Sequence, residues 1–305
     1  MFQLNRPFGM LLALALIGCE ATPTARVSAP RSKEAVQVNG VELNYVEQGK
    51  GIPVVFVHGS LSDLRVWEPY REAVAKSYRF IAYTQRYFGT SPWPDNGKNF
   101  SAATHAADLA AFVRSLNAGP VHLVSWSYGG VVSMLMATAH PELVRSQILF
   151  EPSIRSLIAD LPEGKAAIAE INNIFSPAVA AAKSGDTAQA TKLFLEAVFA
   201  LPPGGFEREP EFWRKIWLDN APTVPLQVAA PPPPAITCDQ LKATKSPLLV
   251  VRGANSYPMW VLIGDAMKRC APDSRIAVIP NVNHDGPMRN PAAVRAALLD
   301  FLAKN

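Results

Sequence analysis

The stretch Val121-His-Leu-Val-Ser-Trp-Ser-Tyr-Gly-Gly-Val131 predicts a strand, a sharp turn and a helix in quick succession. Its centre, Ser125-Trp-Ser127-Tyr-Gly129, matches a pattern in which a serine on a strained turn is flanked by small residues two positions away. Small residues are required there because the strand and the helix approach each other closely. Ser127 immediately precedes the predicted helix and is therefore the candidate nucleophile. The alternative is a strand–helix junction with incidental serines.

Strands and helices alternate along the chain on both sides of this turn. The short apolar runs typical of buried strands lie at 53–57, 79–83, 121–126, 147–150, 247–251 and 275–279. Segments with helical periodicity separate or follow them, at about 67–76, 101–116, 127–140, 259–269 and 291–302. Val36–Val46 alternates around Asn39-Gly40 and predicts an antiparallel hairpin at the sheet edge. Together these patterns predict an α/β fold, a mostly parallel sheet with helices on both faces.

One long segment interrupts this alternation. Residues 155–235 carry helical patterns but no strand pattern, and they close with the stiff run Pro231–Pro234. We expect a helical cap at 155–235, inserted into a core formed by 36–154 and 236–305. Aromatic side chains are frequent in this cap: Phe194, Phe199, Phe206, Phe212, Trp213 and Trp217. They favour an apolar acyl or aryl substrate over a sugar or a polyanion.

The first residues are typical of an export signal. Residues 1–18 place Arg6 before the apolar run Met10–Ile17, as in a secretory signal peptide. The run ends in Leu16-Ile-Gly-Cys19, which resembles a bacterial lipobox and implies that Cys19 becomes lipidated. Residues 19–35 then read as a polar tether. We expect a lipoprotein anchored to a bacterial membrane, facing the periplasm or the cell exterior; the alternative is an ordinary signal peptide with a chance cysteine.

Composition narrows the function classes further. The 305 residues are 49% hydrophobic and 18% charged, with a net charge of +4, which excludes a disordered chain and disfavours a nucleic-acid binder. No metal-ligand spacing such as CxxC or HExxH occurs, so neither a metal nor a cofactor is expected. In an oxidising compartment, Cys238 and Cys270 favour a disulfide, the alternative being two free thiols.

Four motifs together resemble the α/β-hydrolase superfamily. They are Val57-His-Gly-Ser60, Gln85-Arg-Tyr-Phe-Gly-Thr-Ser91, the Ser127 turn and Asn283-His284, which occur in the order of that family. The resemblance covers residues 36 to 302 and implies an eight-stranded hydrolase core, a lid and a Ser–acid–His triad. It also implies an oxyanion hole, formed by the backbone N–H groups of Ser60 and Tyr128.

Five histidines are candidates for the base. His284 follows the last apolar strand and precedes the final helix, and the resemblance places the family's base there. His105, His122 and His140 fall within or at the end of predicted elements, which favours structural roles. His58 lies in the loop of the predicted oxyanion hole and is expected to be structural too.

The acid of the triad is harder to identify from the sequence. Related enzymes commonly carry an aspartate in the loop after the penultimate strand, but Arg252-Gly-Ala-Asn-Ser-Tyr257 contains no carboxylate. Glu151 stands at the end of the preceding strand, where relatives of haloalkane dehalogenases carry their acid. It also preserves the chain order Ser…Glu…His. The alternatives are a solvated loop carboxylate at Glu151 and an incomplete triad.

These residues predict acyl transfer to water. A serine nucleophile argues against the epoxide-hydrolase and dehalogenase chemistries of the same fold, so we expect a serine hydrolase that cleaves a small apolar carboxylic ester. A cofactor-free perhydrolase or a carbon–carbon bond hydrolase could use the same triad. A non-catalytic binding lipoprotein is the third hypothesis, motivated by the vacant acid position.

Overall fold

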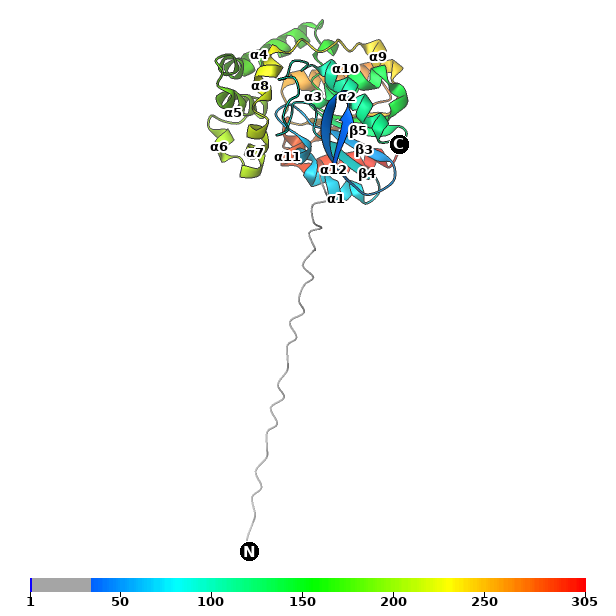
Figure 1. Ribbon diagram of the computed structural model, residues 1–305. Coiled ribbons are helices and arrows are strands. Elements are labelled where there is room, and N and C mark those ends of the chain that lie inside the picture. Colours follow the sequence, from blue (N-terminus) through cyan, green and yellow to red (C-terminus); the bar gives the residue numbers. More distant parts are fainter. Residues whose placement is uncertain (2–33) are drawn as a thin grey trace. The chain divides into compact units, whose positions relative to one another are not determined.

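The computed structural model describes Met1 and residues 34–305 of the chain (Figure 1). The predicted signal peptide, Cys19 and nearly all of the predicted tether lie outside the described residues. Within residues 34–305, no helix is long and apolar enough to cross a membrane.

An eight-stranded sheet forms the centre of this part, in the order β1-β2-β4-β3-β5-β6-β7-β8. The strands are β1 (Glu34–Val38), β2 (Val41–Gln48), β3 (Pro53–Val57), β4 (Arg79–Tyr83), β5 (Val121–Trp126), β6 (Val144–Phe150), β7 (Leu248–Gly253) and β8 (Arg275–Ile279). Strand β2 is antiparallel to β1 and β4, and all other neighbouring pairs are parallel. The predicted α/β class and edge hairpin are confirmed.

The β1–β2 turn has the backbone that its sequence predicts. Asn39 and Gly40 both adopt positive φ, at 46° and 76°. Asparagine and glycine tolerate this region best, and a two-residue turn of this kind matches the twist of the paired strands. The register that results pairs Val38 with Val41.

Helices cover the sheet on both faces. They are α1 (Glu68–Ala75), α2 (Ala102–Ser115), α3 (Tyr128–Ala139), α10 (Pro258–Cys270), α11 (Gly286–Arg289) and α12 (Pro291–Leu302). Alternate residues of β3 point to opposite sides: Phe56 packs against Tyr70 of α1, and Val55 belongs to the cluster that contains Leu109 of α2. Strand β3 is buried along its whole length, which explains its unbroken apolar sequence.

The chain between β6 and β7 is mostly helical. It contains α4 (Pro162–Lys183), α5 (Thr187–Val198), α6 (Gly205–Arg208), α7 (Glu211–Asp219), α8 (Thr223–Ala229) and α9 (Cys238–Ala243). In Figure 1, α4 to α8 gather beside the part that contains the sheet. The helical patterns predicted within residues 155–235 correspond to α4, α5 and α7; the sequence reading missed the short helices α6, α8 and α9.

Polar contacts join this helical insertion to the loop after β3. Asp63 is 2% exposed and accepts hydrogen bonds from Arg65 and from Asn220, whose Nδ2 lies 2.8 Å away. Arg65 also pairs with Asp219 of α7 at 2.8 Å. Asn220 in turn accepts a hydrogen bond from the backbone of Gly89. The loop that carries Ser60 is therefore fixed to the insertion by a buried network.

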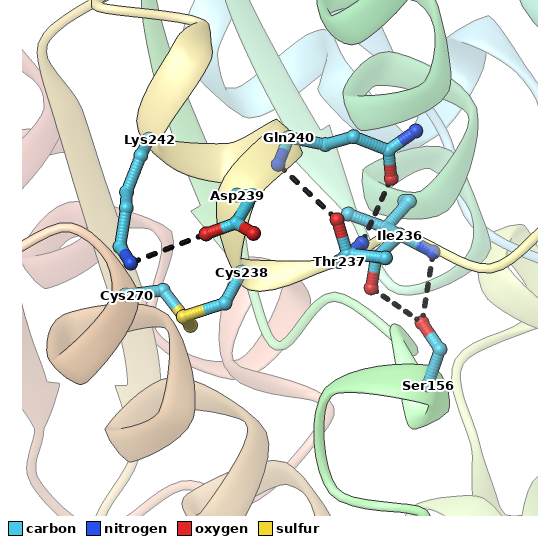
Figure 2. The surroundings of a disulfide bond; sticks show 8 residues. All are labelled: Ser156, Ile236, Thr237, Cys238, Asp239, Gln240, Lys242 and Cys270. Carbon is cyan, nitrogen blue, oxygen red and sulfur yellow. Dashed lines mark hydrogen bonds and ion pairs between the residues drawn. A yellow bond between two sulfur atoms is a disulfide. The ribbon is translucent and has the colours of Figure 1, made fainter.

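A disulfide fixes the chain where it leaves the insertion (Figure 2). Cys238 at the start of α9 is bonded to Cys270 at the end of α10, with an S–S distance of 2.01 Å. Two residues before Cys238, the backbone of Ile236 forms hydrogen bonds with the hydroxyl of Ser156 through both its N–H and its carbonyl. The run Pro231–Pro234 is thus anchored at its downstream end.

Candidate active site

Ser127 occupies the strained turn that its sequence predicts. Its backbone has φ 55° and ψ −116°, between the end of β5 and the first residue of α3. A Cβ atom on Gly129 would lie 2.5 Å from the carbonyl oxygens of Val57 and His58, so only glycine allows this approach. Ser125 stands where the common pattern Gly-x-Ser-x-Gly has its first glycine. It is buried and hydrogen-bonded to Ser133 of α3 at 2.5 Å. That bond satisfies the additional hydroxyl.

His284 is held close to this turn on three sides. Its Nδ1 lies 2.7 Å from Oε2 of Glu151, and its side chain is only 2% exposed. The ring of Trp260, from α10, stacks on the imidazole with centroids 4.0 Å apart. Trp126, the neighbour of Ser127, donates a hydrogen bond from Nε1 to the backbone carbonyl of His284 at 3.0 Å. The imidazole is therefore fixed in position and orientation.

Glu151 is a buried carboxylate with a complete set of partners. It directly follows β6, has a positive φ of 43° and is 1% exposed. Oε1 accepts hydrogen bonds from the backbone N–H of Gly253 and from the hydroxyl of Ser256, and Oε2 contacts His284. The solvated alternative for this residue is wrong. The end of β7 and the loop after it, where the family usually carries its acid, instead supply two donors to an acid that follows the adjacent strand.

Ser153 and Trp260 connect Ser127 to this pair. Ser153 Oγ lies 3.5 Å from Ser127 Oγ and accepts a hydrogen bond from Trp260 Nε1 at 3.3 Å. Among the described residues, no direct hydrogen bond joins Ser127 to His284. Since Glu151 occupies Nδ1, the nitrogen left for the proton of Ser127 is Nε2 of His284. Hydrogen bonds between a nucleophile and its base often tighten only when the substrate is bound.

Two backbone N–H groups beside Ser127 are free to stabilise an oxyanion. Ser60 and Tyr128 line the same cavity as Ser127, and in the described part of the chain neither N–H donates a hydrogen bond to a protein group. Gly59 brings the first of them close, because a Cβ atom there would lie 3.3 Å from that of Ser127. Donors at a serine nucleophile are what a tetrahedral oxyanion requires.

His58 supports this loop without entering the site. Its Nε2 accepts a hydrogen bond from the backbone of Gln85 at 3.0 Å, so Nδ1 carries the proton and donates to the Gly59 carbonyl at 2.8 Å. Complete burial lowers the pKa of His58 to about 4. The residue is neutral and both nitrogens are occupied, in agreement with the structural role predicted for it.

The other histidines are also engaged in local contacts. His105 Nδ1 lies 2.6 Å from the hydroxyl of Tyr128, and burial lowers the pKa of His105 to about 3. His122 contacts Ser146 at 2.7 Å, and burial lowers its pKa to about 4. His140 lies next to Arg114 and Glu142 at the surface. Of the five histidines, only His284 contacts a buried carboxylate.

A cavity of about 890 Å³ opens onto Ser127. Its walls come from the core and from the insertion, with Phe175, Phe194, Val198 and the Pro231–Pro234 run among its lining. The aromatic residues named in the sequence analysis contribute little to this lining. Of the six named, only Phe194 lines this cavity. Phe199 and Phe206 are buried against Trp217, and Phe199 also stacks on Trp126 at the end of β5. The cavity is apolar mainly through aliphatic side chains and proline.

Among residues 34–305, no group of three or more His, Cys, Asp or Glu side chains is arranged to hold a metal ion. The sequence reading missed four side chains that contact the site, namely Ser153, Arg155, Ser256 and Trp260. No local motif marks them; they come from the segments after β6 and β7 and from α10, whose contacts depend on the tertiary fold.

Comparison with known proteins agrees with the resemblance that the sequence motifs carry. The profile of the Alpha/beta hydrolase family matches residues 54–297, most of the described chain. The chain belongs to this family. This alpha/beta hydrolase has the eight-stranded sheet, the serine on a turn and the inserted helices that the resemblance of its sequence motifs implied.

Two curated relatives of this alpha/beta hydrolase match almost their full length. One is 2-(acetamidomethylene)succinate hydrolase from Mesorhizobium japonicum, 26% identical over 278 residues, which cover 88% of this chain and 94% of the relative. The other is the putative non-heme bromoperoxidase BpoC from Mycobacterium tuberculosis, 26% identical over 270 residues, covering 86% and 98%.

Solved structures share the fold. A bromoperoxidase from Bacillus anthracis superposes with a TM-score of 0.74 at 24% identity, covering 89% of this chain and all of the other. A thermophilic esterase from Thermogutta terrifontis gives 0.67 at 24% identity, covering 89% and 97%. At this identity the similarity establishes the fold of the alpha/beta hydrolase, and its substrate has to be argued from the site.

Proposed function

We propose that this alpha/beta hydrolase cleaves a carboxylic ester with an apolar acyl or aryl part, through an acyl-enzyme on Ser127. The observation that carries the proposal is the buried contact between Glu151 and His284 beside the strained serine. A carboxylate on Nδ1 fixes the tautomer whose Nε2 accepts a proton, and it stabilises the imidazolium that forms. The apolar cavity at Ser127 supports an apolar substrate.

The proposed steps use only side chains and backbone groups of the site. His284 Nε2 takes the proton of Ser127 Oγ as that oxygen attacks the ester carbonyl. The N–H groups of Ser60 and Tyr128 stabilise the resulting oxyanion. The tetrahedral intermediate collapses, the alcohol leaves with the proton from His284, and a water molecule activated by the same imidazole then releases the acid.

Covalent labelling and ester turnover test this proposal. A fluorophosphonate probe should label the full-length wild-type protein but not Ser127→Ala, and a series of p-nitrophenyl esters should show turnover that depends on acyl length. Ser115→Ala, at the far end of α2, is a control that should label normally. An unlabelled wild-type protein without ester turnover would overturn the proposal and favour a non-catalytic binding role.

A second candidate reaction keeps the same acyl-enzyme. Relatives named bromoperoxidase favour perhydrolysis, in which hydrogen peroxide instead of water attacks the acyl group and releases a peracid. The two reactions differ only in the second nucleophile, so they compete for one intermediate. Measuring peracid and free acid side by side, at fixed ester and increasing peroxide, separates them: peracid yield exceeding that of Ser127→Ala would support perhydrolysis.

We also propose that the protein is exported and anchored to a bacterial membrane through lipidated Cys19. The support is the Leu16–Cys19 sequence after an apolar run. Wild-type protein should partition into the detergent phase of a cell extract, and Cys19→Ser should not. Equal partitioning of both proteins would contradict the anchor.

A further inference from the structure

Arg155 is the only charged residue among the described residues that line the cavity. It begins a short 3-10 helix after β6, Arg155–Leu157, two residues after Ser153. Asn172 of α4 also lines the cavity, and its Oδ1 accepts a hydrogen bond from Arg155 Nη1 at 3.0 Å. A single cation in an otherwise uncharged, mostly apolar cavity is a specific feature, because apolar packing alone gives no reason to place it there.

Arg155 is half-buried, and it lacks the carboxylate partner that other arginines of the described residues have. Arg65, Arg86 and Arg289 each contact at least one carboxylate. In the described part of the chain, no carboxylate oxygen lies within 4.0 Å of a side-chain nitrogen of Arg155. A guanidinium has five N–H donors, and only the bond to Asn172 uses one of them.

The surroundings of Arg155 disfavour an unpaired charge. Burial lowers the pKa of Arg155, which is the direction expected for a half-buried cation that has no anion beside it. A guanidinium remains charged throughout the working pH range of proteins. An anionic group entering the cavity would supply the missing partner, and the planar guanidinium is suited to the two oxygens of a carboxylate.

We propose that Arg155, oriented by Asn172, binds a carboxylate on the substrate at a distance from the ester that is cleaved. This inference rests on the proposed ester hydrolysis and narrows the class of ester that the enzyme would cleave. Ser153 Oγ lies 3.5 Å from Ser127 Oγ, and two residues of chain span at most about 7 Å. The substrate is accordingly an ester with an apolar middle and an anionic end, several bonds from the scissile carbonyl.

Matched pairs of esters test the inference on the full-length protein. The first pair, p-nitrophenyl hexanoate and mono-p-nitrophenyl adipate, differs by a carboxylate at the end of the acyl chain. The second pair, p-carbamoylphenyl and p-carboxyphenyl hexanoate, places the charge on the alcohol side. For each pair we define the preference as kcat/KM of the anionic ester divided by kcat/KM of the neutral one. Intrinsic reactivity cancels when variants are compared through this ratio.

Removal of the charge should remove the preference. In one of the two pairs, Arg155→Gln should lower the ratio by about tenfold or more, the strength of one charge-assisted hydrogen bond. Arg155→Lys keeps the positive charge but loses the planar guanidinium, so it should retain part of the preference. Asn172→Asp keeps Arg155 and provides a competing carboxylate, so it should lower the ratio as well. Arg269→Gln changes an exposed arginine outside the cavity and should leave the ratio as in the wild type.

The outcomes separate this inference from the function on which it rests. Hydrolysis of the neutral esters with an unchanged ratio in Arg155→Gln and Asn172→Asp, in both pairs, would overturn the role of Arg155 alone. Loss of the preference in Arg269→Gln would also overturn it, since the effect would then follow net charge. If no ester of either pair is cleaved and Ser127 is not labelled, the proposed function fails, and this inference fails with it.

Discussion

Glu151 and His284 are 133 positions apart in the chain, yet Oε2 of the first lies 2.7 Å from Nδ1 of the second. Both side chains are nearly inaccessible to water. The two residues follow the carboxyl ends of β6 and β8, and β7 lies between these strands. Glu151 therefore reaches across β7, and the backbone of Gly253 at the end of that strand donates to its other oxygen.

Loss of the Glu151 charge is the most direct prediction. In Glu151→Gln the side chain keeps its size but no longer stabilises the imidazolium, and kcat for a p-nitrophenyl ester should fall by about 10³–10⁴. Asp285→Asn is the matched control, because Asp285 contacts Arg289 rather than the imidazole, and it should be much milder. Ser256→Ala should lie between them, since one donor to Glu151 is lost while the charge stays. Equal effects of all three substitutions on kcat would contradict the assignment of Glu151.

The tight approach of α3 to the strand ends predicts a stability effect. An alanine side chain at Gly129 would overlap with two backbone carbonyls, which cannot move as a flexible side chain can. Gly129→Ala should lower the free energy of unfolding by about 1–3 kcal/mol, as overpacked cores do. Gly264 in α10 is the control: a Cβ atom there would meet Val250 at an ordinary 3.4 Å, and alanine favours a helix by about 0.5–1 kcal/mol. If urea unfolding shows that Gly129→Ala is as stable as Gly264→Ala or more stable, the result would contradict this view.

The disulfide should contribute to stability through the unfolded state. Its 32-residue loop corresponds to about 3–4 kcal/mol in the chain-entropy model. The double variant Cys238→Ser/Cys270→Ser should lose stability of that order in chemical unfolding, and a reducing agent should destabilise the wild type but not the variant. Titration of the denatured, unreduced protein checks the bond itself. Two reactive thiols from Cys238 and Cys270 would show that the pair is not oxidised.

The buried network at Asp63 predicts an acid-dependent loss of stability. Burial alone would raise the pKa of Asp63, but hydrogen bonds and charge from Arg65, with the amide of Asn220, outweigh it and hold the pKa below its ordinary 3.8. A carboxyl whose pKa is lower when folded stabilises the fold above that ordinary value. The contribution disappears as the pH falls through the lower, folded value. Urea unfolding between pH 2.5 and 6, chosen to bracket a pKa of about 4, should therefore show a steeper decline for the wild type than for Asp63→Asn.

At neutral pH the same comparison has a second expected result. Asp63→Asn should be less stable than the wild type by about 2–3 kcal/mol, because Arg65 and Asn220 lose a charged acceptor. Glu142→Gln, an exposed carboxylate at the surface, is the control and should change little. An Asp63→Asn protein with wild-type stability and an unchanged pH profile would show that the network contributes nothing to the docking of the insertion.

Much of the fold could be predicted from local sequence patterns, and the bounds of the strands show why. Buried parallel strands must be continuously apolar, so runs such as 53–57 mark them with accurate bounds. The strand that leads to Glu151 begins at Val144, three residues earlier than predicted. Its start was missed because the charged Arg145 and the polar Ser146 interrupt its apolar character. Ser127 and His284 carried recognisable neighbours. Trp260 did not, because which face of α10 covers the imidazole depends on how the helix packs.

The position of Glu151 has a consequence for recognising pseudoenzymes. The carboxylate that contacts His284 comes from the residue after β6. The end of β7 and the loop after it therefore need no acid, and they contribute only two hydrogen-bond donors, Gly253 and Ser256. A chain of this fold that lacks an acidic residue after β7 is thus not inert on that ground alone. Surveys that sort such chains into active and dead copies should inspect both strand ends before discarding any of them.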